Sequence, residues 1–365
     1  MKIAILTELF LPSVGGQEVR YAEISQVLTA HGHSVEVYCI HTDRGSEAEG
    51  IIDGAVVHRH PQAYGYLQPI LRILRRRPLA VLRFALRCRS IDPKAFDCFV
   101  FNQWPIAHIF MAPRAMRAKA FIDWCEYRDG LTFGFLQKHL PRLTAANVAN
   151  SIALQRDLQV CSGQRFEVLP SGIFPDRYHC APAREREGIL YLGRIEEHKN
   201  LPLMLSSYKS LLSRGYGGRL RIAGGGPALS KLQKLVKASN IAERVDLLGF
   251  VTEERKIELL ASSEVFLVTS RREGFPRAIA EAMASGLPVV TVDYPENGAK
   301  DVVRQYGIGV VTDPAPSKVA EGVLRVMAEW EMYSRTGVSA SRSLDWEVLI
   351  DKLLQIADGC QANGA

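Results

Sequence analysis

The chain has 365 residues, of which 47% are hydrophobic and 23% charged, which is typical of a soluble globular protein with enough material for about two domains. The net charge of +6 lies mostly in the first half: residues 1–172 hold 20 Lys and Arg against 15 Asp and Glu, and residues 173–365 hold 25 against 24. The seven cysteines are odd in number and form no close pairs, which argues against a disulfide framework or a zinc site and fits a reducing cytoplasm.

Short β-branched or aliphatic runs alternate with helix-length segments in the first half. The predicted strands are KIAIL, SVEVYC, AVVHRH, FDCFVFN, AKAFIDW, ANVAN and RFEVLP. The N-terminal apolar run is short and contains Glu8, so it predicts a first strand and not a signal peptide. No window approaches the ~20 apolar residues of a membrane span.

Two further segments of the first half have marked compositions. Gly15 and Gly16 precede a helical pattern. Residues 71–89, LRILRRRPLAVLRFALRCR, hold seven arginines and no acidic residue, and Pro78 is expected to start or kink a helix. A basic amphipathic helix can lie on an anionic membrane. The alternative is a helix that packs its leucines on the sheet and leaves its arginines in water.

The second half follows a linker at residues 169–188, LPSGIFPDRYHCAPAREREG, which combines prolines, glycines and a charge run. The next predicted strands are GILYLGR, RLRIAGGG, RVDLLGF, VFLVTS, PVVTVD and GIGVVTD. The segment SRSLDWEVLIDKLLQIAD predicts a terminal amphipathic helix, followed by a loose tail, GCQANGA.

This alternation predicts an α/β protein with two doubly wound, Rossmann-like domains. We expect domains at residues 1–172 and 173–340, and a terminal helix and tail at 341–365. We expect the two domains to face one another, so that the carboxyl ends of both sheets meet at one cleft, where ligands of open α/β sheets bind.

Residues 270–290, SRREGFPRAIAEAMASGLPVV, contain two glutamates separated by seven residues. The spacing predicts a buried helix that begins near Pro276, with Glu273 just before it and Glu281 inside it. The backbone N–H groups at such a start suit an anion or a hydroxyl-rich group, and a buried carboxylate can hold a ribose diol. The alternative is structural, with Glu273 favoured by the helix dipole and Glu281 paired with Arg277 at i, i+4.

Two more loops in this half follow predicted strands. Arg194 and Lys199 lie in one loop and are suited to phosphate contacts, although solvated loop cations are the commoner outcome. The Gly-rich run Gly224–Gly226 either lets the backbone approach a ligand or forms a tight turn.

Together these segments resemble the retaining glycosyltransferases of family four, which have the GT-B fold. The resemblance rests on the Glu, seven residues, Glu signature, on the Gly193-Arg194-x4-Lys199 signature and on the early Gly-Gly loop. It covers nearly the whole second half and is looser in the first half, the expected acceptor-binding domain.

The resemblance implies roles for individual residues. Catalytic roles fall to Glu273, which meets the transferred sugar, and to Arg194 and Lys199, which bind and stabilise the leaving diphosphate. The other donor contacts, to the sugar, the ribose, the base and the diphosphate, are Gly274, Phe275, Pro276, Arg277, Glu281, Phe250, Val251 and Gly16.

The acceptor side departs from the family pattern. Where many members carry a histidine, FIDWCEYRDG has Cys125 followed by Glu126. The acceptor-side candidates are therefore Gly15, Cys125, Glu126 and His108, although His108 is also expected to face its own core.

We predict transfer of a hexose from a nucleotide diphosphate sugar to an acceptor hydroxyl with retained configuration, in bacterial polysaccharide or glycolipid biosynthesis. The acceptor is a glycan, lipid or small molecule. No cofactor or metal is expected, since the chain has no Asp-x-Asp pair, and no nucleic acid partner. The expected location is the cytoplasm, with a peripheral site at the inner membrane face through residues 71–89. Two alternatives stay open: a sugar-nucleotide epimerase of the same fold, and a donor-binding protein without catalysis.

Overall fold

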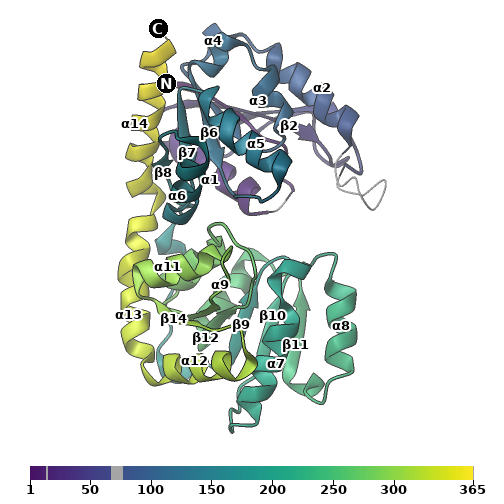
Figure 1. The fold of residues 1–365 in the computed structure, drawn as a ribbon, viewed down its shortest axis with the longest axis vertical. Helices are drawn as coiled ribbons and strands as arrows, with labels where there is room; N and C mark the ends of the chain where they lie inside the picture. The colour runs from purple at the N-terminus through teal and green to yellow at the C-terminus, as the bar shows by residue number, and fades with distance from the viewer. Residues whose placement is uncertain (14, 67–76, 365) are drawn as a thin grey trace. The chain divides into compact units, whose positions relative to one another are not determined.

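The computed structural model describes residues 1–13, 15–66 and 77–364 and divides the chain into two compact units (Figure 1). Unit 1 comprises Met1–Ser171 and Trp346–Ala365, and unit 2 comprises Gly172–Asp345. The boundary lies within the predicted linker. The terminal helix α14 (Trp346–Gly364) belongs to unit 1, whereas we expected a separate segment from residue 341.

The sheet of unit 1 has the strand order β3-β4-β2-β1-β5-β6-β7-β8, and all its neighbouring strands run parallel except β3 against β4. Its strands are β1 Lys2–Leu6, β2 Ser34–His41, β3 Glu49–Ile52, β4 Ala55–Gln62, β5 Cys98–Asn102, β6 Ala120–Trp124, β7 Ala146–Ala149 and β8 Glu167–Val168. Its helices besides α14 are α1 Gly16–Ala30, α2 Pro78–Arg89, α3 Ala107–Met111, α4 Arg114–Arg117, α5 Leu131–His139 and α6 Ile152–Ser162.

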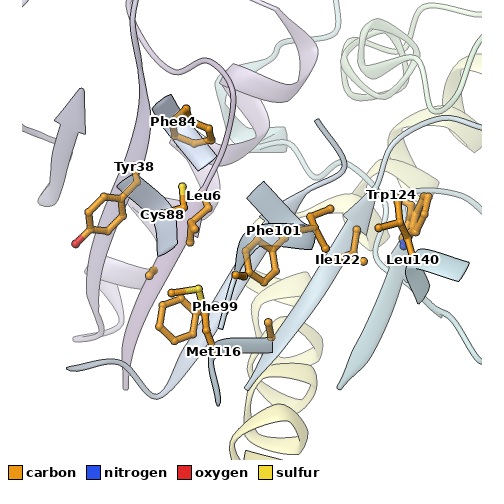
Figure 2. Packing of buried hydrophobic residues seen from close by; sticks show 14 of the residues in the cluster. Leu6, Tyr38, Phe84, Cys88, Phe99, Phe101, Met116, Ile122, Trp124 and Leu140 are labelled. Carbon is orange, nitrogen blue, oxygen red and sulfur yellow. The ribbon is translucent and has the colours of Figure 1, made fainter. Parts of the chain in front are cut away.

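Both faces of the central strands of this sheet are buried, as a parallel sheet covered by helices requires. On one face Leu6, Phe99 and Phe101 pack with Phe84 of α2 and Met116 of α4 in one cluster (Figure 2). On the opposite face α14 contacts β5, β6 and β7 and also packs against α1. The alternation of strand residues between these two layers explains why the strands read as continuous apolar runs.

The sheet of unit 2 is fully parallel in the order β11-β10-β9-β12-β13-β14. Its strands are β9 Ile189–Leu192, β10 Leu220–Ala223, β11 Val245–Gly249, β12 Val265–Val268, β13 Val289–Val292 and β14 Gly309–Thr312. Its helices are α7 Leu201–Leu212, α8 Leu229–Lys237, α9 Glu253–Ser262, α10 Arg277–Ala284, α11 Gly298–Tyr306, α12 Pro316–Ala328 and α13 Trp330–Ser341.

In order of appearance within the unit these strands read 3-2-1-4-5-6, the Rossmann arrangement. The chain reverses its direction across the sheet between β9 and β12. The loops that leave the carboxyl ends of these two strands therefore flank the position at which such folds bind ligands.

Every strand predicted from the sequence is present. Strand β3 was missed because EGII is short and Ile51 is 74% exposed, so it lacks an apolar pattern. The tail predicted to be loose from Gly359 is helical as far as Gly364, because Cys360 is buried and anchors the last turns. Helix α2 begins at Pro78 as predicted, whereas residues 71–76 of the basic segment lie outside the described residues.

Candidate functional site

The loops that follow β9 and β12 are joined by hydrogen bonds at the switch point of unit 2. The Arg271 N–H donates to the His198 carbonyl at 2.7 Å. The Thr269 hydroxyl donates to the carbonyls of Lys199 (3.1 Å) and Asn200 (3.2 Å). The structure thus brings the predicted basic loop and the segment with the two glutamates together, although they lie some seventy residues apart in the chain.

The Gly-rich loop after β10 packs on the same region. Gly224 and Gly226 have φ values of +135° and +157°. A Cβ on Gly224 would lie 1.9 Å from the Gly193 carbonyl oxygen, and a Cβ on Gly226 would lie 2.4 Å from the Ile195 carbonyl oxygen. The Gly193 and Ile195 N–H groups donate to Ala223 and Gly225 at 3.1 and 2.8 Å. These glycines are therefore required for close packing against the loop that follows β9, a role that the sequence analysis did not raise.

Glu273 is held by one of its two carboxylate oxygens. Its Oε1 accepts from Lys199 Nζ at 2.6 Å and from Ser270 Oγ at 2.7 Å. In the described part of the chain Oε2 has no hydrogen-bond partner. The Glu273 side chain is 12% exposed and that of Lys199 16%, so the pair lies in a largely desolvated position with one oxygen available.

Glu281, which lies in the helix α10 after this loop, is also held by one carboxylate oxygen. Helix α10 follows Pro276, which confirms the predicted start, and Glu281 is 4% exposed. Its Oε1 accepts from Lys256 Nζ at 2.9 Å and from Arg277 Nε at 3.0 Å, and no described residue bonds its Oε2. Burial alone would raise the pKa of Glu281, but the charges of Arg277 and Lys256 outweigh it and lower the pKa, so the carboxylate is ionised.

The predicted i, i+4 pair of Glu281 with Arg277 is therefore present, together with a second cation that sequence reasoning missed. Lys256 lies 25 residues before Glu281, on α9. No local spacing signals this contact, because it depends on how α9 packs beside α10. Ser270 was also missed, although its three-residue spacing from Glu273 was a usable signal.

The other donor candidates of unit 2 have different surroundings. No side chain of the described residues caps the N-terminus of α10, next to Gly274 and Phe275. Arg194 is 67% exposed and pairs with Glu196 at 3.0 Å, so Arg194 lies in solvent whereas Lys199 turns toward Glu273. Phe250 is 82% exposed, and its ring lies over Gly225.

In unit 1 the glycine pair begins α1. Gly15 occupies the N-cap with extended backbone, and Gly16 is the first helical residue. A Cβ on Gly15 would lie 2.4 Å from Glu18 Oε2, whereas a Cβ on Gly16 would meet nothing within 4 Å. The surroundings of Gly16 thus leave its backbone accessible without explaining why glycine stands there.

Gln103 organises the turn that carries Cys125 and Glu126. Its Oε1 accepts from the N–H groups of both residues at 3.1 Å and from the Cys125 thiol at 3.3 Å. The Glu126 carboxylate pairs with Arg128 (2.6 Å) and accepts from Trp104 Nε1 (2.9 Å). Burial and the negative charges of Glu126 and Asp123 raise the pKa of Cys125 well above its usual value, so the thiol stays neutral.

His108 is wrong as an acceptor-side candidate. Its side chain is fully buried between the rings of Phe84 and Phe101, with Nδ1 against the Pro105 carbonyl. Burial lowers the pKa of His108 to about 4, so it is neutral. The second expectation for this residue, that it faces its own core, is confirmed.

Two further properties of the described residues concern metal ions and membranes. No group of three or more His, Cys, Asp and Glu residues within them is arranged to hold a metal ion. None of the helices described has the length and apolar character needed to cross a membrane.

Residues 181–342 match the family model "Glycosyl transferases group 1". Alpha-D-kanosaminyltransferase from Streptomyces kanamyceticus is 30% identical over 44% of this chain and 43% of its own length. The next two curated relatives are also matched over only 36% and 56% of their own lengths.

Other similarities extend over the whole chain. A GDP-mannose-dependent alpha-mannosyltransferase from Mycobacterium tuberculosis is 24% identical over 97% of this chain and 95% of its own. The solved structure of sucrose-phosphate synthase from Thermosynechococcus elongatus superimposes with a TM-score of 0.79 at 18% identity, covering 97% of this chain and 98% of that one. This likeness confirms the predicted GT-B fold with its two Rossmann-like domains.

Proposed function

The chain carries a glycosyltransferase domain of the family-four type in a GT-B fold, and from this premise we propose that the protein transfers a hexose from a nucleotide diphosphate sugar to an acceptor hydroxyl with retention of configuration. The observation that supports this most is the matched pair of carboxylates at the switch point. Glu273 and Glu281 each have one oxygen fixed by two donors and the other without a described partner. Carboxylate acceptors fixed in this way suit sugar hydroxyls.

In the proposed mechanism Glu281 holds the ribose of the donor and Glu273 holds the transferred hexose. Lys199 lies beside Glu273 and stabilises the negative charge that develops on the leaving diphosphate, with Arg194 free to fold onto the same phosphates from solvent. The departing phosphate takes the proton of the attacking hydroxyl on the same face of the sugar. This route requires neither a metal ion nor a protein base.

A donor panel followed by one substitution tests the site. We expect nucleoside diphosphate sugars to raise the melting temperature, since a ligand that binds only the native state stabilises it. Glu281→Gln should then weaken the affinity in calorimetry by about 10- to 100-fold, because a hydrogen bond to a charged group contributes roughly 1.5–3 kcal/mol.

The matched control is Glu258→Gln, which removes an exposed ion pair with Arg255 on α9. Equal affinities of Glu281→Gln and the wild type would contradict the ribose role. Donor turnover without any acceptor would favour the epimerase, and donor binding without transfer to any acceptor would favour the non-catalytic protein.

The proposed acceptor is presented at an anionic membrane surface, which α2 contacts. The buried face of α2 packs into unit 1 through Ala80, Phe84, Ala85 and Cys88. Its outer face exposes Leu79, Leu82 and Leu86 at 57%, 47% and 49%, interleaved with the exposed arginines Arg83 and Arg87. The helix therefore packs on unit 1 through other side chains than the leucines that the sequence analysis placed on the sheet. The exposed leucines and arginines together support the proposed contact with an anionic membrane surface.

Liposome sedimentation tests this surface. We expect binding that requires anionic lipid, weakens with salt, and drops when Arg83, Arg87 and Arg89 become glutamine. Replacement of the exposed Arg156 and Arg165 of unit 1 by glutamine is the control. Equal sedimentation with neutral and anionic vesicles, or none with either, would favour an acceptor that is a free small molecule.

A further inference from the structure

Lys256 belongs to the carboxylate site, although it is far from it in sequence. Its side chain is 19% exposed, and its Nζ lies 2.9 Å from Glu281 Oε1 and 2.7 Å from Glu253 Oε1. Arg277 Nε approaches the same Glu281 oxygen at 3.0 Å. The two cations reach this oxygen from different helices, α9 and α10.

This arrangement restricts the orientation of the carboxylate. The terminal torsion of a glutamate side chain is broad, so a single donor on its own helix leaves the group free to turn. Donors from two helices fix both the position of Oε1 and the plane of the carboxylate. The second oxygen, Oε2, is then held in one direction before any ligand arrives, which reduces the ordering cost of binding.

Helix α9 also connects this contact to another part of the donor site. Thr252 caps the helix by accepting a hydrogen bond from the Arg255 N–H at 3.3 Å. Phe250 and Val251, the proposed contacts of the nucleotide base, immediately precede this cap. Lys256 follows one turn later, so a short, rigid segment links the base contact to the ribose contact.

We propose that Lys256 is a positioning residue for the donor nucleotide, holding Glu281 so that Oε2 accepts the hydroxyls of the ribose. This inference rests on the proposed function of the site. The charged groups around the Glu281 carboxylate are Arg277 and Lys256 themselves, with Glu253 on the outer side of Lys256. A role confined to stability would not distinguish a ribose from a deoxyribose, whereas a role in orienting Oε2 would.

The test is calorimetry of the full chain with UDP and GDP and with their 2′-deoxy counterparts. We expect the wild type to bind one ribonucleotide about tenfold more tightly than its deoxy form, as expected when one hydrogen bond to a charged group is lost. Lys256→Met should weaken binding of the ribonucleotide and bring this ratio close to one. Lys256→Arg should restore most of the ratio, since arginine supplies the same charge and donors.

The matched control is Lys231→Met. Lys231 is an exposed lysine on α8 and forms an ion pair with Glu197. A ribose preference in Lys256→Met equal to that of the wild type would overturn the role of Lys256 and leave the proposed function intact. Failure of the wild type to bind any nucleoside diphosphate sugar of the donor panel would overturn the proposed function, and this role with it. Circular dichroism and melting curves of each variant identify any that fails to fold, and Lys256→Gln then replaces Lys256→Met.

Discussion

The two units differ in what their buried and half-buried charged side chains contact. In unit 2, Lys199 contacts Glu273 and Lys256 contacts Glu281, and each carboxylate keeps an oxygen without a described partner. In unit 1, Arg20 is fully buried, and its guanidinium donates hydrogen bonds only to residues of the same unit among those described. The comparison supports the proposal that Glu273 and Glu281 of unit 2 bind a ligand, whereas the contacts of Arg20 hold the fold of unit 1 together.

The contacts of Arg20 are extensive. Its Nε and Nη2 donate to Asp123 at 2.9 and 3.2 Å, and the Tyr21 hydroxyl donates to the same carboxylate at 3.0 Å. Further bonds reach the carbonyls of Leu169 (3.0 Å) and Pro170 (2.7 Å). This network connects α1 and β6 to Leu169 and Pro170, just before the chain enters unit 2, and its role is therefore structural.

The largest expected effect is on the stability of unit 1. Arg20→Met should lower the free energy of unfolding by about 3–5 kcal/mol, because it leaves Asp123 as an uncompensated buried charge. Denaturant unfolding followed by circular dichroism measures the loss. Arg114→Met, on the surface helix α4, should change stability by less than about 0.5 kcal/mol. A loss of under ~1 kcal/mol in Arg20→Met would contradict the structural role of the network.

The second effect is the pH dependence of stability that His108 contributes. The native pKa is lowered from 6.5 to about 4, so between these values the unfolded chain binds a proton that the folded chain does not. Stability from this group is therefore complete above pH 6.5 and is lost as the pH falls toward 4, by roughly 3 kcal/mol in all.

Melting curves at pH 7 and pH 5 measure this dependence. The decrease in melting temperature should be smaller in His108→Asn, which has no group that titrates in this range. His139→Asn, a partly exposed histidine at the end of α5, is the control and should retain the wild-type decrease. An equal decrease in His108→Asn and the wild type would show that other groups cause the acid sensitivity.

The third effect is on turnover and concerns unit 2. Lys199→Ala should lower kcat by at least about tenfold, or ~1.4 kcal/mol, because a stabiliser of the leaving group and a fixed partner of Glu273 are both lost. Stability should change little, since Glu273 keeps its bond from Ser270. Lys231→Ala is the control, because exposed ion pairs contribute only about 0–1 kcal/mol. Unchanged turnover in Lys199→Ala would assign the ion pair with Glu273 a structural role and remove the contrast between the units.

The sequence predicted most strands of both units and the segment of the candidate site that contains Glu273 and Glu281. Strand periodicity identified the parallel strands, because strands buried on both faces read as apolar runs. Local spacing identified Glu273, Glu281 and the helix start at Pro276. Lys256 was missed because its contact depends on the packing of α9 beside α10. The sequence left two roles open for His108, and only the structure shows that it lies in the core of unit 1.

The smallest expected effect concerns Cys125, which stands where many members of the resembling family carry a histidine. The raised pKa keeps its thiol neutral, and its hydrogen is donated to Gln103 Oε1 at 3.3 Å. Cys125→Ser preserves a donor to the same oxygen, so we expect transfer rates within about twofold of the wild type, at most ~0.4 kcal/mol. The profile of rate against pH should also be the same between pH 7 and 9, since no thiolate forms there. A tenfold loss in Cys125→Ser, or a wild-type rise in rate toward pH 9 that the variant lacks, would instead place the thiol in the chemistry and give unit 1 a reactive group of its own.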